Sequence, residues 1–322
     1  ARGDVMSETH SQPLPLNGLR VLDATHIVAG PFCSLILADM GAEVIKIERP
    51  KSGDLVRGRG PFIQNDEGEQ VSSRYLGINR NKKSVTLDLR NPKCKEVFEN
   101  LVLQSDILID NWGPGAFERL GLGYEHLHEI NPRLIYASIT GYGDYGERKG
   151  PYSSWPANNL SIQSMSGWME ITGDPDGPPQ SVGDNVGDSV PGVWTALGIM
   201  MALESRNKTG VGQLVDMAMY DCMVSHVVSN MNAYQATNNN PGRSRARLVS
   251  AGMPFKAKDG YVIMAGVRSE HRLQSMWKMI GRLDLAEDPK YLGHNPDGDF
   301  YFNYVIPAIE EWSEKLPKWE VA

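Results

Sequence analysis

The chain has 322 residues, of which 41% are hydrophobic and 22% charged, a balance typical of a globular protein with room for two domains. Its net charge of -7 argues against bulk binding to nucleic acid, but leaves open a local basic site for a small phosphorylated ligand. The longest apolar run, residues 193–203, is too short to span a bilayer, and the polar residues 1–12 do not resemble a signal peptide. We therefore expect a cytoplasmic protein that binds neither membrane nor nucleic acid.

The three cysteines support the same compartment. Cys33, Cys94 and Cys222 are widely spaced, which argues against a disulfide framework and fits a reducing environment. No partner base accompanies Cys33, so we interpret it as a buried core thiol rather than a nucleophile.

Strand and helix patterns alternate through the first half of the chain. Strands are predicted at residues 20–24, 43–48, 83–89, 106–110 and 134–139, and helices at 32–40, 95–104 and 124–129. This alternation predicts an α/β fold, a Rossmann-like domain whose mostly parallel sheet is covered on both faces. Ligands of such sheets bind at the carboxyl ends of the strands, so functional residues are expected in the loops that follow them.

The second half is less regular. A loop-like stretch rich in glycine and proline precedes a long apolar helix predicted from Pro191 to Ser205, and residues 213–219 form the next predicted strand. A loose polar segment and a turn at residues 258–260 then lead into a smaller unit. We expect a large domain at residues 14–225, and a linker with a smaller domain at 226–322.

Two generic motifs have plain structural explanations. Residues 141–146 match G-x-G-x-x-G after a strand, but the following sequence predicts a loop instead of the helix that a dinucleotide requires. His126 and His128 are two residues apart and do not share a helix face, so we expect surface histidines and no metal site.

Asp188 supports two interpretations. It lies in Gly187-Asp188-Ser189, just before Pro191 and the apolar helix, where aspartate or serine commonly caps a helix. A helix N-terminus would also keep the carboxylate ionised, as a nucleophile requires, and nearby amides would stabilise an oxyanion. Similarly, His26 and the small residues after the first strand either contact a ligand or form a turn.

Several segments resemble the family III CoA transferases. They occur in the family's order at residues 19–54, 79–89, 110–127, 131–143, 187–192 and 208–221, and span most of residues 14–225. The resemblance implies the family's fold, a homodimer with interlocked chains, and transfer of CoA from an acyl-CoA to a carboxylic acid without a metal or redox cofactor. Family chains continue beyond the end of this one, so we expect this chain to be shorter than a full-length member.

The resemblance also implies roles for individual residues. The aspartate of the family's GDS motif is its nucleophile, which corresponds to Asp188. The implied CoA contacts are His26, Ile27, Val28, Ala29, Arg49, Lys82, Asn111, Trp112, Arg119 and Met219. The cationic side chains among them come from separate strand ends, which one ligand with several phosphates could bridge.

Residues 155–159, 177–192 and 243–252 look most like the succinyl-CoA-dependent transferases that act on malate or citramalate. A dicarboxylate needs a cation for its second carboxylate, and Arg243, Arg245 and Arg247 either supply it or form a solvated basic turn.

Formyl-CoA transferase carries a glutamine in place of Val28, and residues 247–255 lack its run of glycines, so formate and oxalate are not expected as substrates. One alternative is a 2-methylacyl-CoA racemase, whose His-Asp pair would fall at Asn158 and Asn159, two amides that cannot act as bases. The other alternative is a CoA-binding module without turnover.

Overall fold

The computed structural model describes residues 13–145, 149–240, 242–243, 252–264, 269–292 and 298–322. These residues form two compact units. The first contains Ala1–Trp168 and Ser181–Val227, and the second contains Met169–Gln180 and Val228–Ala322. The sequence predicted a boundary after residue 225, whereas the structure has it after Val227 and adds an earlier segment to the second unit.

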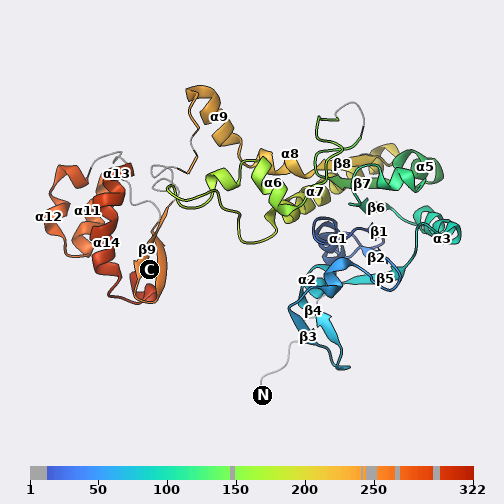
Figure 1. Ribbon diagram of the computed structural model, residues 1–322, viewed down its shortest axis with the longest axis horizontal. Coiled ribbons are helices and arrows are strands. Elements are labelled where there is room, and N and C mark those ends of the chain that lie inside the picture. The colour runs from blue at the N-terminus through green and yellow to red at the C-terminus, as the bar shows by residue number, and fades with distance from the viewer. Residues whose placement is uncertain (1–12, 146–148, 241, 244–251, 265–268, 293–297) are drawn as a thin grey trace, which may run out of the picture. The chain divides into compact units, whose positions relative to one another are not determined.

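A parallel six-stranded sheet forms the centre of the first unit, in the order β5-β2-β1-β6-β7-β8. Its strands are β1 (Arg20–Ala24), β2 (Glu43–Glu48), β5 (Lys82–Thr86), β6 (Ile107–Asp110), β7 (Ile135–Thr140) and β8 (Leu214–Ala218). From β1 the chain moves outward to β2 and β5, then returns to β6 on the other side (Figure 1). The direction of winding therefore reverses between β1 and β6, where open α/β sheets bind ligands.

Helices bury both faces of the central strands of this sheet. On one face, α1 (Ala29–Asp39) and α7 (Val186–Thr209) share a core with β1, β6 and β7. On the other, the core includes Phe98 of α3 (Pro92–Leu103) and Leu127 of α5 (Tyr124–Ile130). The unit also contains α2 (Ser73–Asn79), α4 (Ala116–Arg119), α6 (Asn159–Met165), α8 (Met219–Ser225) and the short 3-10 helix η1 (Leu55–Gly58).

The start of α7 differs from the prediction. The helix begins at Val186 instead of Pro191, which lies in its second turn and removes one backbone hydrogen bond. Asp188 is consequently a first-turn residue rather than a cap, and Asn185 precedes the helix without a capping side-chain bond. Among the described residues α7 is the one helix long and apolar enough to cross a membrane, by length and composition alone, yet it packs against α1, α8 and the sheet.

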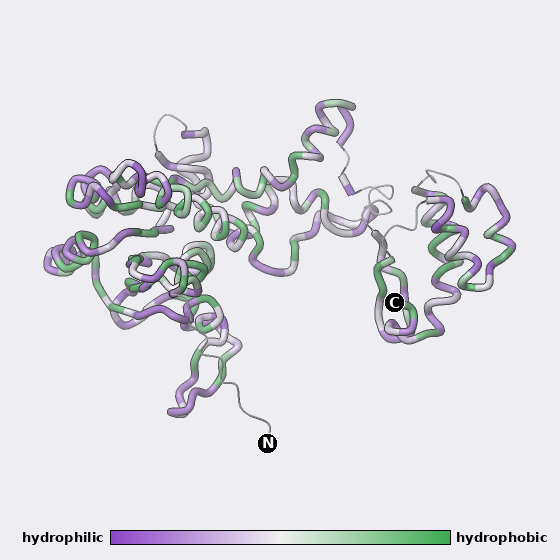
Figure 2. Tube along the Cα trace, turned by 180° about the vertical axis from the view of Figure 1, so that it is seen from behind, coloured by the Kyte–Doolittle hydropathy of each residue, from purple (hydrophilic) through white to green (hydrophobic). Residues whose placement is uncertain are grey.

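A small antiparallel hairpin was not predicted. Its strands are β3 (Phe62–Gln64) and β4 (Gln70–Ser72), and the hydrophilic tip between them is visible in Figure 2. The strands are only three residues long, too short for a period-two pattern to be recognised in the sequence.

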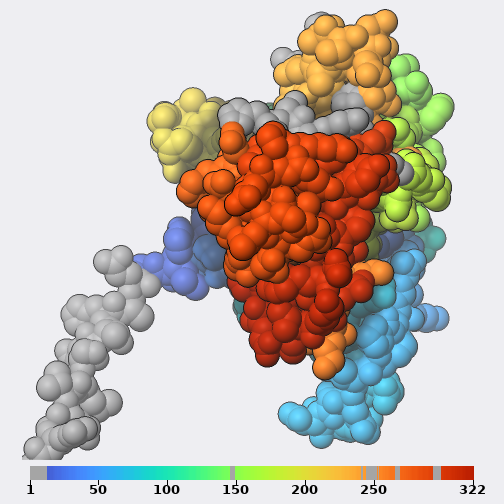
Figure 3. All heavy atoms as spheres, turned by 90° about the vertical axis from the view of Figure 1, so that its left-hand side faces the viewer, coloured from blue at the N-terminus to red at the C-terminus, as the bar shows by residue number. Residues whose placement is uncertain are grey.

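The second unit has its own core. The hairpin of β9 (Met253–Ala257) and β10 (Gly260–Met264) contributes Phe255, which joins Trp277 of α11 (Glu270–Met279) and Ile309 of α14 (Ile306–Ser313). These packed elements are drawn in orange and red in Figure 3. The remaining elements are η3 (Met169–Ile171), α9 (Val228–Thr237), α12 (Leu283–Ala286), η4 (Pro289–Tyr291), α13 (Gly298–Phe300), the π-helical turn Tyr301–Val305 and α15 (Lys318–Val321).

Candidate active site

A cavity of about 670 Å³ opens in the first unit, beside the loops that follow β1, β6 and β7. Nearly all of the residues singled out by the family resemblance line it: His26, Ile27, Val28, Ala29, Asn111, Trp112, Arg119, Asp188 and Met219. The two exceptions, Arg49 and Lys82, lie elsewhere in the unit. The carboxyl ends of β1 and β6 and the N-terminus of α7 thus converge on one cavity, at the position where the sheet topology predicts a ligand.

Asp188 lies in this cavity with a perturbed carboxyl group. Within the described parts of the chain, no side-chain hydrogen bond or ion pair of its carboxylate is found, and burial raises its pKa to about 6. The sequence predicted that the helix N-terminus would keep this group ionised, whereas burial shifts its pKa upward. With a pKa near 6, about nine-tenths of the groups are still ionised at pH 7.

The turn before Asp188 is fixed by Asn159, the first residue of α6. The Asn159 Oδ1 atom accepts hydrogen bonds from the backbone N–H of Gly187 and from Gln163 Nε2, both at 2.9 Å. A Cβ atom on Gly187 would lie 2.5 Å from the backbone oxygen of Asn159, so glycine is required for this close approach. Asn159 therefore sets the position of the Asp188 backbone.

The amides around Asp188 are already used within the turn. Gly187 N–H donates to Asn159, while the N–H groups of Asp188 and Ser189 donate to Asn185 O at 3.0 and 2.8 Å. The sequence-based expectation that these amides stabilise an oxyanion is therefore wrong in this geometry. Ala29, which lines the cavity at the start of α1, is a better donor, since its N–H has no acceptor among the described residues.

The loop after β1 is held from two sides. Asn111 accepts the His26 N–H at 2.8 Å and donates to the His26 carbonyl at 2.9 Å. Ile27 has a φ of 70°, in the left-handed region, and its N–H donates to Asp54 Oδ1 at 3.2 Å. Such a conformation persists in a residue like isoleucine only when its surroundings enforce it, and such strain concentrates at functional sites.

The imidazole of His26 is an uncharged part of the cavity wall. Burial lowers its pKa, and neither ring nitrogen has a hydrogen-bond partner among the described residues. Its ring centroid lies 5.2 Å from that of Trp112.

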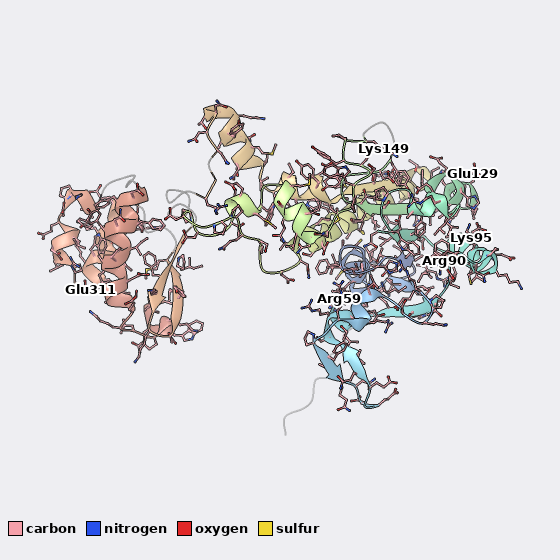
Figure 4. All side chains as sticks on the ribbon, viewed as in Figure 1. Arg59, Arg90, Lys95, Glu129, Lys149 and Glu311 are labelled. Carbon is pink, nitrogen blue, oxygen red and sulfur yellow. The ribbon has the colours of Figure 1, made fainter. Side chains whose placement is uncertain are left out.

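Trp112 also lines a second region, a cationic cavity of about 550 Å³ that contains Arg49. The Arg49 guanidinium carbon lies 5.5 Å from the Trp112 ring centroid, within cation–π range. Lys51 and Arg90 line the same cavity, and Figure 4 labels Arg90. Lys51 lies in the loop after β2, where ligand contacts were expected, whereas no sequence signal pointed to Arg90.

Lys82 is placed in the core instead. Its ammonium donates to Asp23 Oδ2 at 3.0 Å, Pro31 O at 2.8 Å and Asn79 Oδ1 at 2.9 Å. These three acceptors occupy all three ammonium hydrogens. The geometry therefore does not favour Lys82 as a phosphate ligand, and a direct contact to CoA stays a prediction.

Comparisons with known proteins identify the family. A model of CoA-transferase family III matches residues 16–321. The chain belongs to this family. It is 41% identical over 276 residues to a succinyl-CoA:mesaconate CoA-transferase from Haloarcula hispanica, covering 85% of this chain and 69% of the relative. Identity to a formyl-CoA:oxalate CoA-transferase from Streptomyces coelicolor is 36% over 328 residues, covering 95% and 76%.

A solved structure agrees with these sequence relatives. The crystal structure of a CAIB/BAIF family protein from Brucella suis matches with a TM-score of 0.87 and 34% identity, over 96% of this chain and 81% of that one. The family and fold implied by the sequence resemblance are therefore confirmed. The chain is a family III CoA transferase, which also decides against a CoA-binding module without turnover.

Arg243 has a structural role in this transferase. Its guanidinium donates to the carbonyl oxygens of Met169, Glu170, Asp174 and Gly177 at 3.1–3.2 Å, fastening the segment 169–180 within the second unit. These bonds leave little capacity for a substrate carboxylate, so the interpretation of Arg243 as a dicarboxylate ligand is not supported. Arg245 and Arg247 lie outside the described residues.

The generic motifs take structural roles in the transferase. No helix opens in residues 141–145, where the N–H groups of Asp144 and Tyr145 donate to Asp216. His126 is exposed and contacts Glu99 Oε1 at 2.8 Å. Among the described residues, no group of three or more His, Cys, Asp or Glu side chains is arranged to hold a metal ion.

Proposed function

We propose that this enzyme transfers CoA from succinyl-CoA to a C4 or C5 dicarboxylic acid of the malate or citramalate type, with Asp188 as the nucleophile. One observation carries the proposal: the Asp188 carboxylate, which has no partner among the described residues, lies in a cavity that shares Trp112 with a neighbouring cationic cavity. An acyl-CoA has a thioester at one end and a phosphorylated nucleotide at the other, and these two cavities suit its two ends.

In the first half-reaction, the Asp188 carboxylate attacks the donor thioester carbon, the carbon–sulfur bond breaks and CoA thiolate leaves. The product is a mixed anhydride between Asp188 and the donor acyl group. The thiolate then attacks the Asp188 carbonyl carbon of the anhydride. This breaks the carbon–oxygen bond, releases the donor acid as its carboxylate and leaves an aspartyl-CoA thioester.

In the second half-reaction, the acceptor carboxylate attacks the aspartyl-CoA thioester and expels the thiolate again. The thiolate then attacks the acceptor acyl carbon of the new anhydride, which regenerates the Asp188 carboxylate. Each step exchanges one acyl bond for another without a change of oxidation state, and we propose no metal or redox cofactor.

The surrounding residues would assist in distinct ways. The Ala29 N–H at the start of α1 supplies a donor for the tetrahedral oxyanions, worth about 3–4 kcal/mol for one well-placed group. Arg49 and Lys51 supply positive charge for the nucleotide phosphates, whereas Arg90 in the same cavity is paired with Asp88. His26, Asn111 and Trp112 shape the passage between the two ends of the ligand.

The names of the relatives support the substrate class. The Haloarcula enzyme is named for succinyl-CoA and mesaconate, and the Streptomyces enzyme for oxalate. Mesaconate and oxalate are both dicarboxylic acids. Val28 replaces the glutamine of formyl-CoA transferase in the loop after β1, which is why we expect longer diacids here instead of oxalate or formate.

A panel of acceptor acids with succinyl-CoA as donor tests the proposal. Malate and citramalate should give higher kcat/KM values than formate, oxalate, carnitine or simple monocarboxylates. A clear preference for a monocarboxylate or for carnitine would overturn the proposed substrate class. Because Asp188→Ala should abolish transfer for every acid in the panel, this variant checks the mechanism separately from the specificity.

We also propose that the active form is a homodimer. One side of α7 exposes Val193, Leu197, Met200 and Met201, each more than 40% accessible, as an apolar stripe. Stripes of this kind commonly mark protein interfaces, and a second copy of this chain would fit the interlocked arrangement that the family resemblance implies. An active monomer in sedimentation experiments would overturn this assignment.

The racemase alternative lacks its base in this structure. Asn158 caps α6 by accepting the N–H groups of Leu160 and Ser161, and Asn159 holds Gly187. Both side chains are neutral amides that cannot remove a proton near neutral pH. We expect no exchange of the α-hydrogen of 2-methylacyl-CoA in deuterated water, and exchange at turnover-like rates would restore the racemase interpretation.

A further inference from the structure

Arg59 has an unusual position among the arginines of the first unit. It follows η1, lines the Asp188 cavity, and also lines an adjoining cavity of about 640 Å³ (Figure 4 labels the residue). The two cavities share Ile27, Val28, Asn159, Leu160 and Asn185 as well, so they adjoin each other at the loop after β1 and the start of α6. Because Arg59 and Asp188 line the same cavity, a small molecule bound at Asp188 can extend toward Arg59.

The backbone of Arg59 is anchored while its side chain is not engaged. The Arg59 N–H donates to Val56 O at 3.0 Å, and its carbonyl oxygen accepts a hydrogen bond from the Ser72 hydroxyl. Within the described residues, the exposed guanidinium makes no hydrogen bond or ion pair. Its attachment point is thus fixed, and all five of its N–H donors are available to a ligand.

Arg57, two residues earlier, shows the opposite arrangement. Its guanidinium makes two hydrogen bonds of 2.7 Å to Glu48 and lies 3.8 Å from the Tyr75 ring centroid. Because Arg57 and Glu48 satisfy each other, that carboxylate is not available to Arg59. The local chain therefore contains one structural arginine and one arginine that faces the substrate cavity.

The adjoining cavity has the composition expected for a short diacid. Phe32, Val56, Ile78, Leu160 and Val182 provide apolar walls for methylene groups. Its charged lining residues are Arg59, Arg74 and Asp184, and the Asp184 carboxylate accepts hydrogen bonds from the backbone and side-chain N–H groups of Asn185. The lining is therefore net cationic.

We infer that Arg59 binds the non-reacting carboxylate of a dicarboxylic substrate while the other carboxyl group reacts at Asp188. The inference rests on the proposed function and gives it a specificity residue. Without a cation, a second carboxylate would be desolvated and would lie near the negative charge of Asp188, which is strongly unfavourable. The planar guanidinium can bind a carboxylate through two parallel hydrogen bonds, whereas an ammonium cannot.

The test compares substrates that differ by one carboxylate. Succinyl-CoA and butyryl-CoA have acyl chains of equal length, and butyryl-CoA ends in a methyl group instead. Arg59→Gln should lower kcat/KM for succinyl-CoA by roughly 10- to 100-fold and that for butyryl-CoA by less than about threefold. Arg59→Lys should recover part of the loss, because it keeps the charge but not the fork of donors.

If butyryl-CoA reacts too slowly with the wild type, inhibition constants provide a second test. Arg59→Gln should raise the inhibition constant of succinate by roughly 10- to 100-fold and leave that of succinamate, which has a single charge, within about threefold. Arg80→Gln is the matched control, since Arg80 is an exposed arginine that pairs with Asp39 and lines neither cavity. It should leave all of these constants unchanged.

Equal losses of kcat/KM for succinyl-CoA and butyryl-CoA in Arg59→Gln would overturn the inference. A loss that is selective for succinyl-CoA in Arg74→Gln instead of Arg59→Gln would overturn it as well. Acylation of Asp188 by butyryl-CoA in the wild type reports on the proposed mechanism separately. If acylation occurs but Arg59→Gln shows no selectivity, only the assignment of Arg59 fails. If neither thioester acylates Asp188, the proposed function itself fails.

Discussion

Asn159 Oδ1 accepts the backbone N–H of Gly187 at 2.9 Å, which connects the first residue of α6 to the residue just before Asp188. We predict that Asn159→Ala removes this restraint and lets the Asp188 carboxylate leave its reactive position. The expected losses are at least about tenfold in kcat and about 1 kcal/mol in the free energy of unfolding. Steady-state kinetics and urea denaturation measure both.

Asn91→Ala is the matched control for this variant. Asn91 caps α3 by accepting the Lys93 N–H at 3.0 Å and lines none of the cavities described above. It should cost a similar amount of stability, about 1 kcal/mol, without changing kcat. Equal activity of the two variants would show that the bond between Asn159 and Gly187 is merely structural.

The pKa of Asp188 predicts a pH-dependent first step. The nucleophile is the ionised carboxylate and burial raises its pKa to about 6, so acylation by an acyl-CoA should accelerate as the pH rises through that value and then level off. Release of CoA in a single turnover, followed between about pH 5 and pH 8, measures the rate. A rate that is constant over this range would contradict the assignment.

The same shift predicts a pH-dependent stability difference. Folded Asp188 holds its proton more tightly than the unfolded chain does, so ionisation costs folding stability as the pH rises from the ordinary value of 3.8 to about 6. Asp188→Asn removes this loss. The variant should therefore gain stability relative to the wild type across that window, and the difference should stay constant above it. A variant whose relative stability falls as the pH rises would show that the shift has the opposite sign.

Gly192 determines how closely α7 approaches α1. A Cβ atom at this position would lie 2.7 Å from the backbone oxygen of Ala29, which cannot move without displacing the loop after β1. Gly192→Ala should lower both Tm and kcat, with a stability loss of about 1–3 kcal/mol. In Gly150→Ala the new Cβ meets nothing within 4 Å, so this control should behave like the wild type. An unchanged kcat in Gly192→Ala would show that the spacing of α1 and α7 does not control the site.

A variant of Lys82 distinguishes its role in a core ion pair from a role as a CoA ligand. Its partner Asp23 is fully buried. Although burial alone would raise the pKa of Asp23, Lys46 and Lys82 outweigh burial and hold it well below its usual range. Lys82→Ala should destabilise the fold by about 3–5 kcal/mol by leaving Asp23 with less compensation. At a temperature where the variant is folded, its Kd for CoA should stay within about threefold of the wild type. Weaker CoA binding with an unchanged Tm would restore the role that the family resemblance implies.

The sequence predicted the central strands of the sheet well, because β1, β2, β6 and β7 are largely buried. The predicted strand at residues 20–24 matches β1, and the one at 43–48 matches β2. Sequence rules for helix starts and strand patterns failed where tertiary contacts determine the local structure. Proline usually marks a helix start, but α7 begins a turn before Pro191. The hairpin of β3 and β4 was missed because its strands are too short to show a pattern.

The site was only partly accessible from the sequence. The family motifs identified Asp188 and the loop after β1 as functional, because a motif marks residue types at fixed positions. The structure places both in one cavity. Arg59 carries no such signal, since Arg57 and Arg59 look alike in sequence. The structure separates them, because Arg57 is paired with Glu48 and Arg59 lines the Asp188 cavity. In the same way, three acceptors around Lys82 reveal a buried role that its charge alone does not.

Trapping the acyl group on Asp188 tests its role as the nucleophile directly. The protein is incubated with succinyl-CoA, treated with hydroxylamine or borohydride, digested and analysed by mass spectrometry. We predict that Asp188 alone is modified, and that Asp188→Ala shows neither modification nor more than a few per cent of wild-type transfer. Modification at another residue, or substantial transfer by Asp188→Ala, would contradict it.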